Sequence, residues 1–202
     1  NCNMVEGSVT INGDDITNLF GLSNLTLIGW ALNIGIVDEG CPSLISLSGL
    51  ENLTSMFKLS VASNDSLTSL NGLNNLNSWS IIDINNNSSL VSLSGLEGFD
   101  TINEINIENN DALTSLAGLN NLTTLMGLGP WGPTLSIHDN DALEDLSGLE
   151  NLTSLQKGDG TESGISIQGN DALVNLEGIE SIDVETIQNL SIINNPNLFV
   201  CD

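Results

Sequence analysis

Hydrophobic positions along the chain follow a long repeat rather than the period of one helix or one strand. Each copy begins with a short L-x-I unit, in which two large apolar side chains flank a polar one. Further leucines then recur at every third position, and a glycine precedes one of them. Alternation is typical of a short strand with one buried face, and the three-residue spacing favours bends and short extended pieces over a long helix.

The base period of the repeat is 23 residues. The central Ile or Val of the L-x-I unit marks each copy, with successive spacings of 23, 27, 23, 23, 30, 30 and 25 residues. The markers are Ile11, Ile34, Val61, Ile84, Ile107, Ile137, Ile167 and Ile192. One copy cannot bury its own apolar edge, whereas stacked copies can, so such a period indicates a solenoid.

We therefore predict an all-β, right-handed parallel β-solenoid of about eight coils, with seven-residue loop insertions in two of them. A single domain is expected over residues 1–202. Residues 1–8 are expected to form an N-terminal cap, and the C-terminal cap is expected to be missing, since nothing cap-like follows Asp202.

An asparagine and a glycine recur at fixed places in the repeat. The asparagine follows the strand unit, and its amide is expected to hydrogen-bond to the backbone of the coils above and below. The glycine suits a corner with positive φ or a close approach between coils. The asparagines are Asn64, Asn87, Asn110, Asn140, Asn170 and Asn195, and the glycines are Gly21, Gly49, Gly72, Gly95, Gly118, Gly148 and Gly178.

The opening segment CNMVEGSVTI (2–11), followed by the asparagine corner and the x-G-L step, resembles the receptor L-domain family. These are the leucine-rich, β-helix-like modules of insulin- and growth-factor-receptor ectodomains. The near-identical coils are also similar to repeats of secreted or surface bacterial proteins. The resemblance covers the whole chain and implies the fold, an extracellular or cell-surface location and a binding rather than catalytic role. Receptor L domains are richer in cysteine and basic residues, so the ligand does not carry over.

The charge of the chain limits its partners. Two Lys and no Arg stand against 26 Asp and Glu, which gives a net charge of −24. Nucleic acid is excluded as a partner, because neutralising phosphates requires many cationic side chains. No apolar run is long enough for a spanning helix, so membrane insertion is not expected. We expect an acidic, monomeric protein that binds a protein or glycan ligand.

Three cysteines are an odd number, and no zinc site is expected from cysteines so far apart with a single histidine. Cys2 precedes the first coil and Cys41 lies in an insertion of the second. Neighbouring coils bring the two within reach of a disulfide, so a Cys2–Cys41 bridge is one interpretation. The other is that they remain separate thiols.

Aromatic side chains near one edge of the solenoid are the candidate ligand-binding residues. Trp131 and Pro130 lie in the inserted segment 126–134, which should stack on the insertion 156–164 of the next coil. Trp30, Phe57 and Trp79 fall near the same edge of coils two to four. Exposed aromatic rings on a rigid scaffold can stack on sugar rings or on a protein partner. The alternative is that the last three cover the corner or fill the core.

Calcium is the candidate cofactor. Asp159, Thr161 and Glu162 offer clustered oxygen ligands in a glycine-rich loop, although the spacing matches no strong calcium motif. The alternative is a solvated acidic loop.

We predict a non-enzymatic recognition or adhesion module. One alternative is a polysaccharide-processing enzyme that uses paired carboxylates, such as Asp14 with Asp15, Asp139 with Asp141, or Glu144 with Asp145. The other is a structural spacer of a larger surface adhesin.

Overall fold

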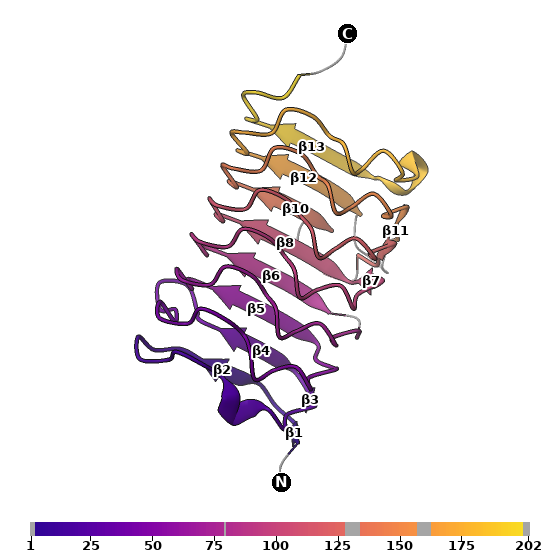
Figure 1. Ribbon diagram of the computed structural model, residues 1–202. Coiled ribbons are helices and arrows are strands. Elements are labelled where there is room, and N and C mark those ends of the chain that lie inside the picture. The colour runs from indigo at the N-terminus through magenta and orange to yellow at the C-terminus, as the bar shows by residue number, and fades with distance from the viewer. Residues whose placement is uncertain (1–2, 79, 128–133, 157–162, 200–202) are drawn as a thin grey trace.

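The chain forms a parallel β-solenoid in which short strands stack in about seven turns (Figure 1). A computed structural model describes residues 3–78, 80–127, 134–156 and 163–199. Eight strands make one parallel sheet in the order β13-β12-β10-β8-β6-β5-β4-β2, and the two termini lie at opposite ends of the stack. The predicted all-β solenoid is confirmed. The eight strands of the sheet are β2 (Val9–Ile11), β4 (Ala31–Ile34), β5 (Lys58–Ala62), β6 (Ile81–Asn85), β8 (Glu104–Glu108), β10 (Leu135–His138), β12 (Gly164–Gln168) and β13 (Asn189–Ile193).

Shorter strands form the second side of the coils. They build a two-stranded sheet β1-β3 and a three-stranded sheet β11-β9-β7, both parallel. Residues 4–5, which fall in the expected N-terminal cap, pair as β1 with the second coil. The bounds are β1 (Met4–Val5), β3 (Leu27–Ile28), β7 (Thr101–Ile102), β9 (Thr124–Leu125) and β11 (Ser154–Leu155), with two 3-10 turns, η1 (Phe20–Leu22) and η2 (Val184–Thr186).

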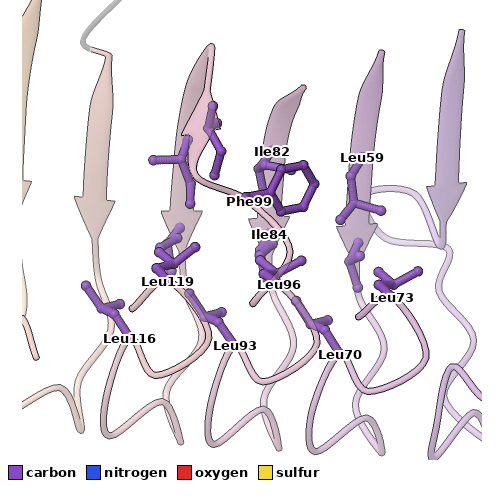
Figure 2. Close-up of a cluster of buried hydrophobic side chains, with 14 of the residues drawn as sticks. Leu59, Leu70, Leu73, Ile82, Ile84, Leu93, Leu96, Phe99, Leu116 and Leu119 are labelled. Atoms are coloured by element: carbon purple, nitrogen blue, oxygen red, sulfur yellow. The ribbon is translucent and has the colours of Figure 1, made fainter. Parts of the chain in front are cut away.

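The core is a set of aliphatic columns that run along the solenoid (Figure 2). Both large residues of the L-x-I units within the stack are buried, as Ile82 and Ile84 are, whereas Leu190 in the last strand is 56% exposed. The leucines at every third position complete the layer. Leu70, Leu93 and Leu116 occupy the same place in successive coils and are fully buried. Each coil therefore buries its apolar residues against its neighbours, and one sequence repeat corresponds to one coil of the stack.

The recurrent asparagines form a buried ladder, as predicted. The backbone N–H of each donates to the side-chain oxygen of the next, at 3.0–3.2 Å from Asn64 to Asn195. The amide nitrogen also donates to carbonyls of its own coil and of the preceding one. Asn110 Nδ2, for example, lies 3.0 Å from Glu108 O and 3.1 Å from Ile84 O. One side chain thus satisfies backbone groups in its own coil and in the preceding one, and it contacts the next coil through the side chain of Asn140.

The glycine of the x-G-L step has both a positive φ and a close contact with the preceding coil, the two properties that the sequence suggests. Gly49, Gly72, Gly95, Gly118, Gly148 and Gly178 have φ of 111–119°. A Cβ on Gly95 would collide with the carbonyl oxygen of Leu70 in the preceding coil. Gly21 differs: it lies within the 3-10 turn η1, its φ is not positive and a Cβ would meet nothing within 4 Å.

Cys41 is a free, fully buried thiol that occupies the ladder position of its coil. Its backbone N–H donates to Asn64 Oδ1 at 3.1 Å, and its Sγ lies 3.5 Å from Ile11 O, where other coils place an amide. Burial raises the pKa of this thiol. Of the two interpretations that the sequence leaves open, a free thiol at Cys41 agrees with separate thiols rather than with a bridge. Cys2 itself lies outside the described residues.

Replacing a ladder asparagine should strongly destabilise the fold. Asn110→Ala removes the acceptor of the buried Asn87 N–H and two hydrogen bonds to Ile84 O and Glu108 O, of which Glu108 O keeps its bond from Asn86 N–H. The unpaired N–H costs about 1–3 kcal/mol and each of the other lost hydrogen bonds about 0.5–1.5 kcal/mol, so the free energy of unfolding should fall by at least about 2 kcal/mol. Asn121→Ala is the control, because it removes one exposed hydrogen bond to Glu97 O and should cost less than about 1 kcal/mol. Equal losses in urea titrations of the two variants would contradict this role of the ladder.

Candidate functional site

The outward face of the large sheet presents side chains in columns, because its strands pair in register. Residues at equivalent strand positions on successive coils lie side by side: Lys58 opposite Ile81 and Ile81 opposite Glu104, and likewise Ser60, Asp83 and Asn106. Ser60, Asp83 and Asn106 lie between the two buried residues of their L-x-I units, and Lys58, Ile81 and Glu104 directly precede those units. Neighbouring strands lie about 4.8 Å apart, so a column of such side chains forms one continuous surface.

A groove of about 250 Å³ crosses this face over β5, β6, β8 and β10. We call it the outer-face groove, and its polar lining consists of Lys58, Asp83, Glu104, Asn106 and Ser136. Lys58 is one of two cationic side chains in the sequence, and its Nζ lies 3.6 Å from Asp83 Oδ2. The groove therefore combines an ammonium group, two carboxylates, an amide and a hydroxyl.

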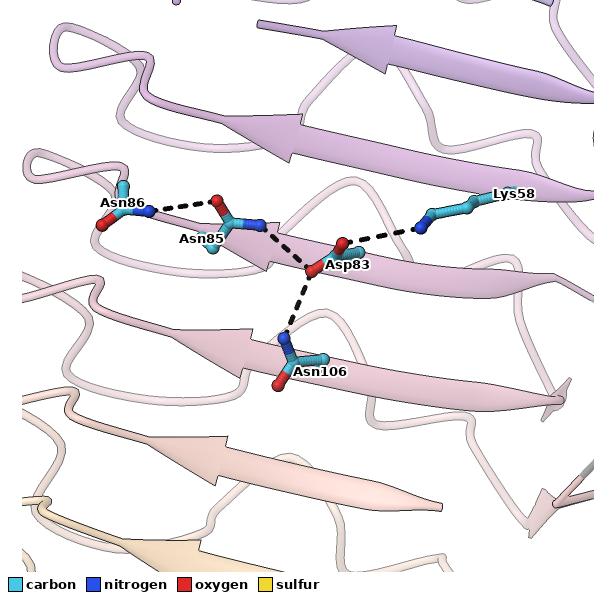
Figure 3. A network of polar contacts seen from close by, with 5 residues as sticks. All are labelled: Lys58, Asp83, Asn85, Asn86 and Asn106. Carbon is cyan, nitrogen blue, oxygen red and sulfur yellow. Dashed lines mark hydrogen bonds and ion pairs between the residues drawn. The ribbon is translucent and has the colours of Figure 1, made fainter. Parts of the chain in front are cut away.

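Asp83 is the centre of the polar network in the groove (Figure 3). Its Oδ1 accepts hydrogen bonds from Asn85 Nδ2 at 3.1 Å and from Asn106 Nδ2 at 3.2 Å, while Oδ2 faces Lys58. Asn86 Nδ2 in turn donates to Asn85 Oδ1. These contacts fix the orientation of the Asp83 carboxylate, and about a quarter of its side chain remains exposed. A ligand would meet an oriented acceptor rather than a mobile one.

Glu104 differs from Asp83 because it lacks such partners among the described residues. Desolvation by burial raises the pKa of the Glu104 carboxyl and the charge of Asp83 raises it further, whereas the charge of Lys58 opposes both. Burial thus favours the neutral form of the Glu104 carboxyl within the groove.

An exposed aromatic pair lies at the start of the strands. Trp30 and Phe57 stack with ring centroids 4.7 Å apart and an interplanar angle of 20°. Trp30 directly precedes β4, and Phe57 directly precedes Lys58, which lines the outer-face groove. Both rings remain open to solvent, Trp30 with 57% of its surface and Phe57 with 38%. The sequence predicts both residues as aromatic edge residues.

The remaining predicted site residues fall outside the described part of the chain. They are Trp131, Pro130 and Trp79 among the aromatic candidates, and Asp159, Thr161 and Glu162 of the calcium candidate. The residues that flank the two insertions do lie on adjacent coils at one corner, since Gln156 N–H donates to Leu125 O at 2.6 Å.

A second, larger hollow of about 740 Å³ lies beyond the opposite ends of the strands. Five carboxylates line it: Asp14, Asp15, Asp38, Glu39 and Asp65. Within the described residues, however, no three His, Cys, Asp or Glu side chains gather closely enough to hold a metal ion. We therefore assign no metal centre to this hollow.

A serine–histidine contact occurs further along the outward face. His138 Nε2 lies 2.8 Å from Ser166 Oγ and 3.2 Å from Ser136 Oγ. Ser166 is only 5% exposed, and its Oγ also accepts a hydrogen bond from Gln168 Nε2 at 2.8 Å. The hydroxyl is therefore shielded from a substrate, and the cluster is a packing arrangement rather than a nucleophilic site.

Lys58, Asp83, Glu104 and Asn106 are the site residues that the sequence interpretation missed. They stand at the polar positions of the L-x-I strands, which the repeat analysis uses only to define the inward face. Aligning the copies and comparing these positions down each column would have found them, because a cation, two carboxylates and an amide interrupt columns that are otherwise small or neutral.

The protonation of Glu104 predicts a pH-dependent effect on stability. Its raised pKa means that the folded state holds the Glu104 proton more tightly than the unfolded state does, so ionisation of Glu104 destabilises the fold as the pH rises above about 4.3. Glu104→Gln should therefore raise the melting temperature by a few degrees at pH 7, and this gain should disappear below about pH 4. Thermal melts from pH 3.5 to 8 test this.

Glu144→Gln, at an exposed position, controls for the loss of one negative charge from a chain of net charge −24. The same gain in both variants would assign the effect to the net charge rather than to the groove.

The outward face thus has a polar groove with an oriented carboxylate, and an exposed aromatic pair whose Phe57 directly precedes the groove residue Lys58.

Among the described residues, no helix has the length and apolar character needed to cross a membrane. Comparisons with protein-family models, with curated proteins and with solved structures find no match to this chain.

Proposed function

We propose that the protein is a non-enzymatic recognition module that binds a glycan across the outward face of its large sheet. The observation that carries the proposal is the outer-face groove, with its ammonium, carboxylate, amide and hydroxyl groups, next to the exposed Trp30–Phe57 pair. Sugars present hydroxyl groups around a ring with apolar C–H faces. A binding site for them needs donors and acceptors beside an aromatic surface.

The scaffold supports this use of the groove. Lys58, Asp83, Glu104 and Asn106 all stand on strands that are paired on both sides. Their backbones are therefore fixed by the sheet, and little conformational entropy remains to be lost when a ligand binds. An open face of parallel strands also lets an extended oligomer lie across several coils. These properties favour an oligosaccharide over a single small molecule.

The charge and the sequence resemblance favour a role outside the cell. A net charge of −24 keeps a protein soluble and repels anionic surfaces. The likeness to receptor L domains supports a secreted or surface-displayed, monomeric binding module of the leucine-rich repeat type. Calcium at Asp159, Thr161 and Glu162 remains part of the proposal as an accessory ion.

The second candidate function is polysaccharide processing by paired carboxylates. The specific observation in its favour is that Glu104, with a raised pKa, shares the groove with Asp83. Glycosidases need one carboxyl that holds a proton and one that is ionised. In this reading Glu104 is the acid and Asp83 the base or nucleophile. Turnover of the bound glycan is the property that separates the two functions.

A glycan array, run with calcium and again with a chelator, tests the proposed function. We expect a defined set of hits, and Asp83→Asn should weaken binding to them by tenfold or more, because it removes a charged acceptor worth roughly 1.5–3 kcal/mol. Asp171→Asn, which removes an exposed carboxylate at the asparagine corner, should leave the affinity unchanged.

A blank array in both conditions would overturn glycan binding and direct the search to a protein ligand or to a spacer role. Release of shorter sugars from a hit, abolished by Glu104→Gln, would instead identify an enzyme.

A further inference from the structure

Trp30 has one covered ring face and one open face. The 4.7 Å between the Trp30 and Phe57 centroids matches the spacing of adjacent strands, and the rings are within 20° of parallel. The two rings therefore stack along the solenoid axis, one ring per coil. Phe57 covers the face of Trp30 that points toward the third coil. The opposite face points toward the first coil, and Trp30 keeps 57% of its surface exposed.

Gly7 is the residue that lies next to Trp30. Gly7 stands between β1 and β2 on the first coil, and Trp30 stands between β3 and β4 on the second. The pairings Val5–Ile28 and Val9–Leu32 hold the two coils in one register on both sides, which places Gly7 opposite Trp30. A hydrogen bond of 3.1 Å from Trp30 N–H to Gly7 O confirms that the two backbones are adjacent. The aromatic stack thus reaches a coil whose equivalent position carries no side chain.

Neither the backbone nor the packing requires a glycine at this position. Gly7 is exposed, its φ is not positive, and a Cβ built on it would meet nothing within 4 Å. The glycines of the x-G-L step are different, because a Cβ there would collide with the preceding coil. The effect of Gly7 is to leave a space one coil deep against the indole. We call this space the open rung.

From this geometry we propose that the open rung binds one pyranose ring of the glycan, with the apolar C–H face of the sugar stacked on Trp30. The inference rests on the proposed function and identifies the ring contact of that same site. A pyranose with equatorial hydroxyls fits best, because its axial C–H bonds give a flat apolar face to the indole while its hydroxyls point outward.

Charge narrows the ligand class further. A chain with net charge −24 repels uronic acid polymers and sialylated glycans, so the ligand is a neutral glycan or one built of amino sugars. The open rung lies on the first coil, and the outer-face groove begins on the third. About 10–15 Å separates them at the strand spacing, so a short oligosaccharide occupies both.

The test uses the full chain and isothermal titration with cellohexaose, chitohexaose and mannohexaose. Gly7→Leu fills the open rung and Trp30→Ala removes the indole, and each should weaken binding of the preferred hexasaccharide about tenfold. Gly21→Leu is the matched control. Gly21 also lies on the first coil, has no positive φ and would give a Cβ nothing within 4 Å, but it is remote from Trp30 in the repeat. It should bind within twofold of wild type.

The outcomes separate the two proposals. Wild-type affinity in Gly7→Leu, together with loss of binding in Asp83→Asn, overturns the open rung and leaves the proposed function standing. No heat of binding from wild type with any of the three hexasaccharides overturns both. Loss of binding in Gly7→Leu with an unchanged melting temperature supports the open rung, because the fold is then intact and only the space beside Trp30 has been filled.

Discussion

The asparagine ladder is the interaction on which the rest of the structure depends. A corner that turns a strand out of a parallel sheet leaves backbone N–H and C=O groups pointing into the core, where an unpaired group costs free energy. From Asn64 to Asn170, each ladder amide satisfies the corner of its own coil and also bonds to the coils on either side, as Asn64 does. The ladder therefore does two things at once: it makes the corners possible and it sets the register between coils.

The register between coils determines which polar side chains lie next to one another on the outward face. Once every strand is aligned with its neighbours, residues of equal repeat position stack at the strand spacing, and a substitution in one copy appears at a defined place in a column. Asp83 lies beside Asn106 and within ion-pair distance of Lys58 for this reason, although 23 and 25 residues separate them in the chain. The Trp30–Phe57 stack follows from the same alignment, with 27 residues between its members.

The architecture is predictable from the sequence because the repeat encodes local and long-range structure together. The 23-residue period, the inward L-x-I pairs, the Asn corner and the tight glycine step each have one physical interpretation, and the structure agrees with all four. Two departures come from interactions that a single repeat does not contain. Gly21 lies in a 3-10 turn and has no close contact, and Cys41, a free thiol, takes the place of a ladder amide. The groove residues were missed because their meaning lies in the comparison of columns across coils, not in the pattern within one coil.

When a charged residue recurs at the same position of successive coils, its side chains lie in one column and repel one another. Equivalent carboxylates of adjacent coils lie about one strand spacing apart, a distance at which like charges repel. Asp141 shows the effect: desolvation raises its pKa, and the charges of Asp171 and Asp111 in the same column raise it further. Neutral amides avoid this repulsion, which explains why the buried ladder uses asparagine. The column in the outer-face groove is different. Asp83 accepts a hydrogen bond from Asn106 and faces Lys58, so the negative charge of Asp83 is compensated at the surface. These two contacts join Asp83 to the coils on both sides. The position where neighbouring copies differ in charge is also the place at which we propose that a ligand binds.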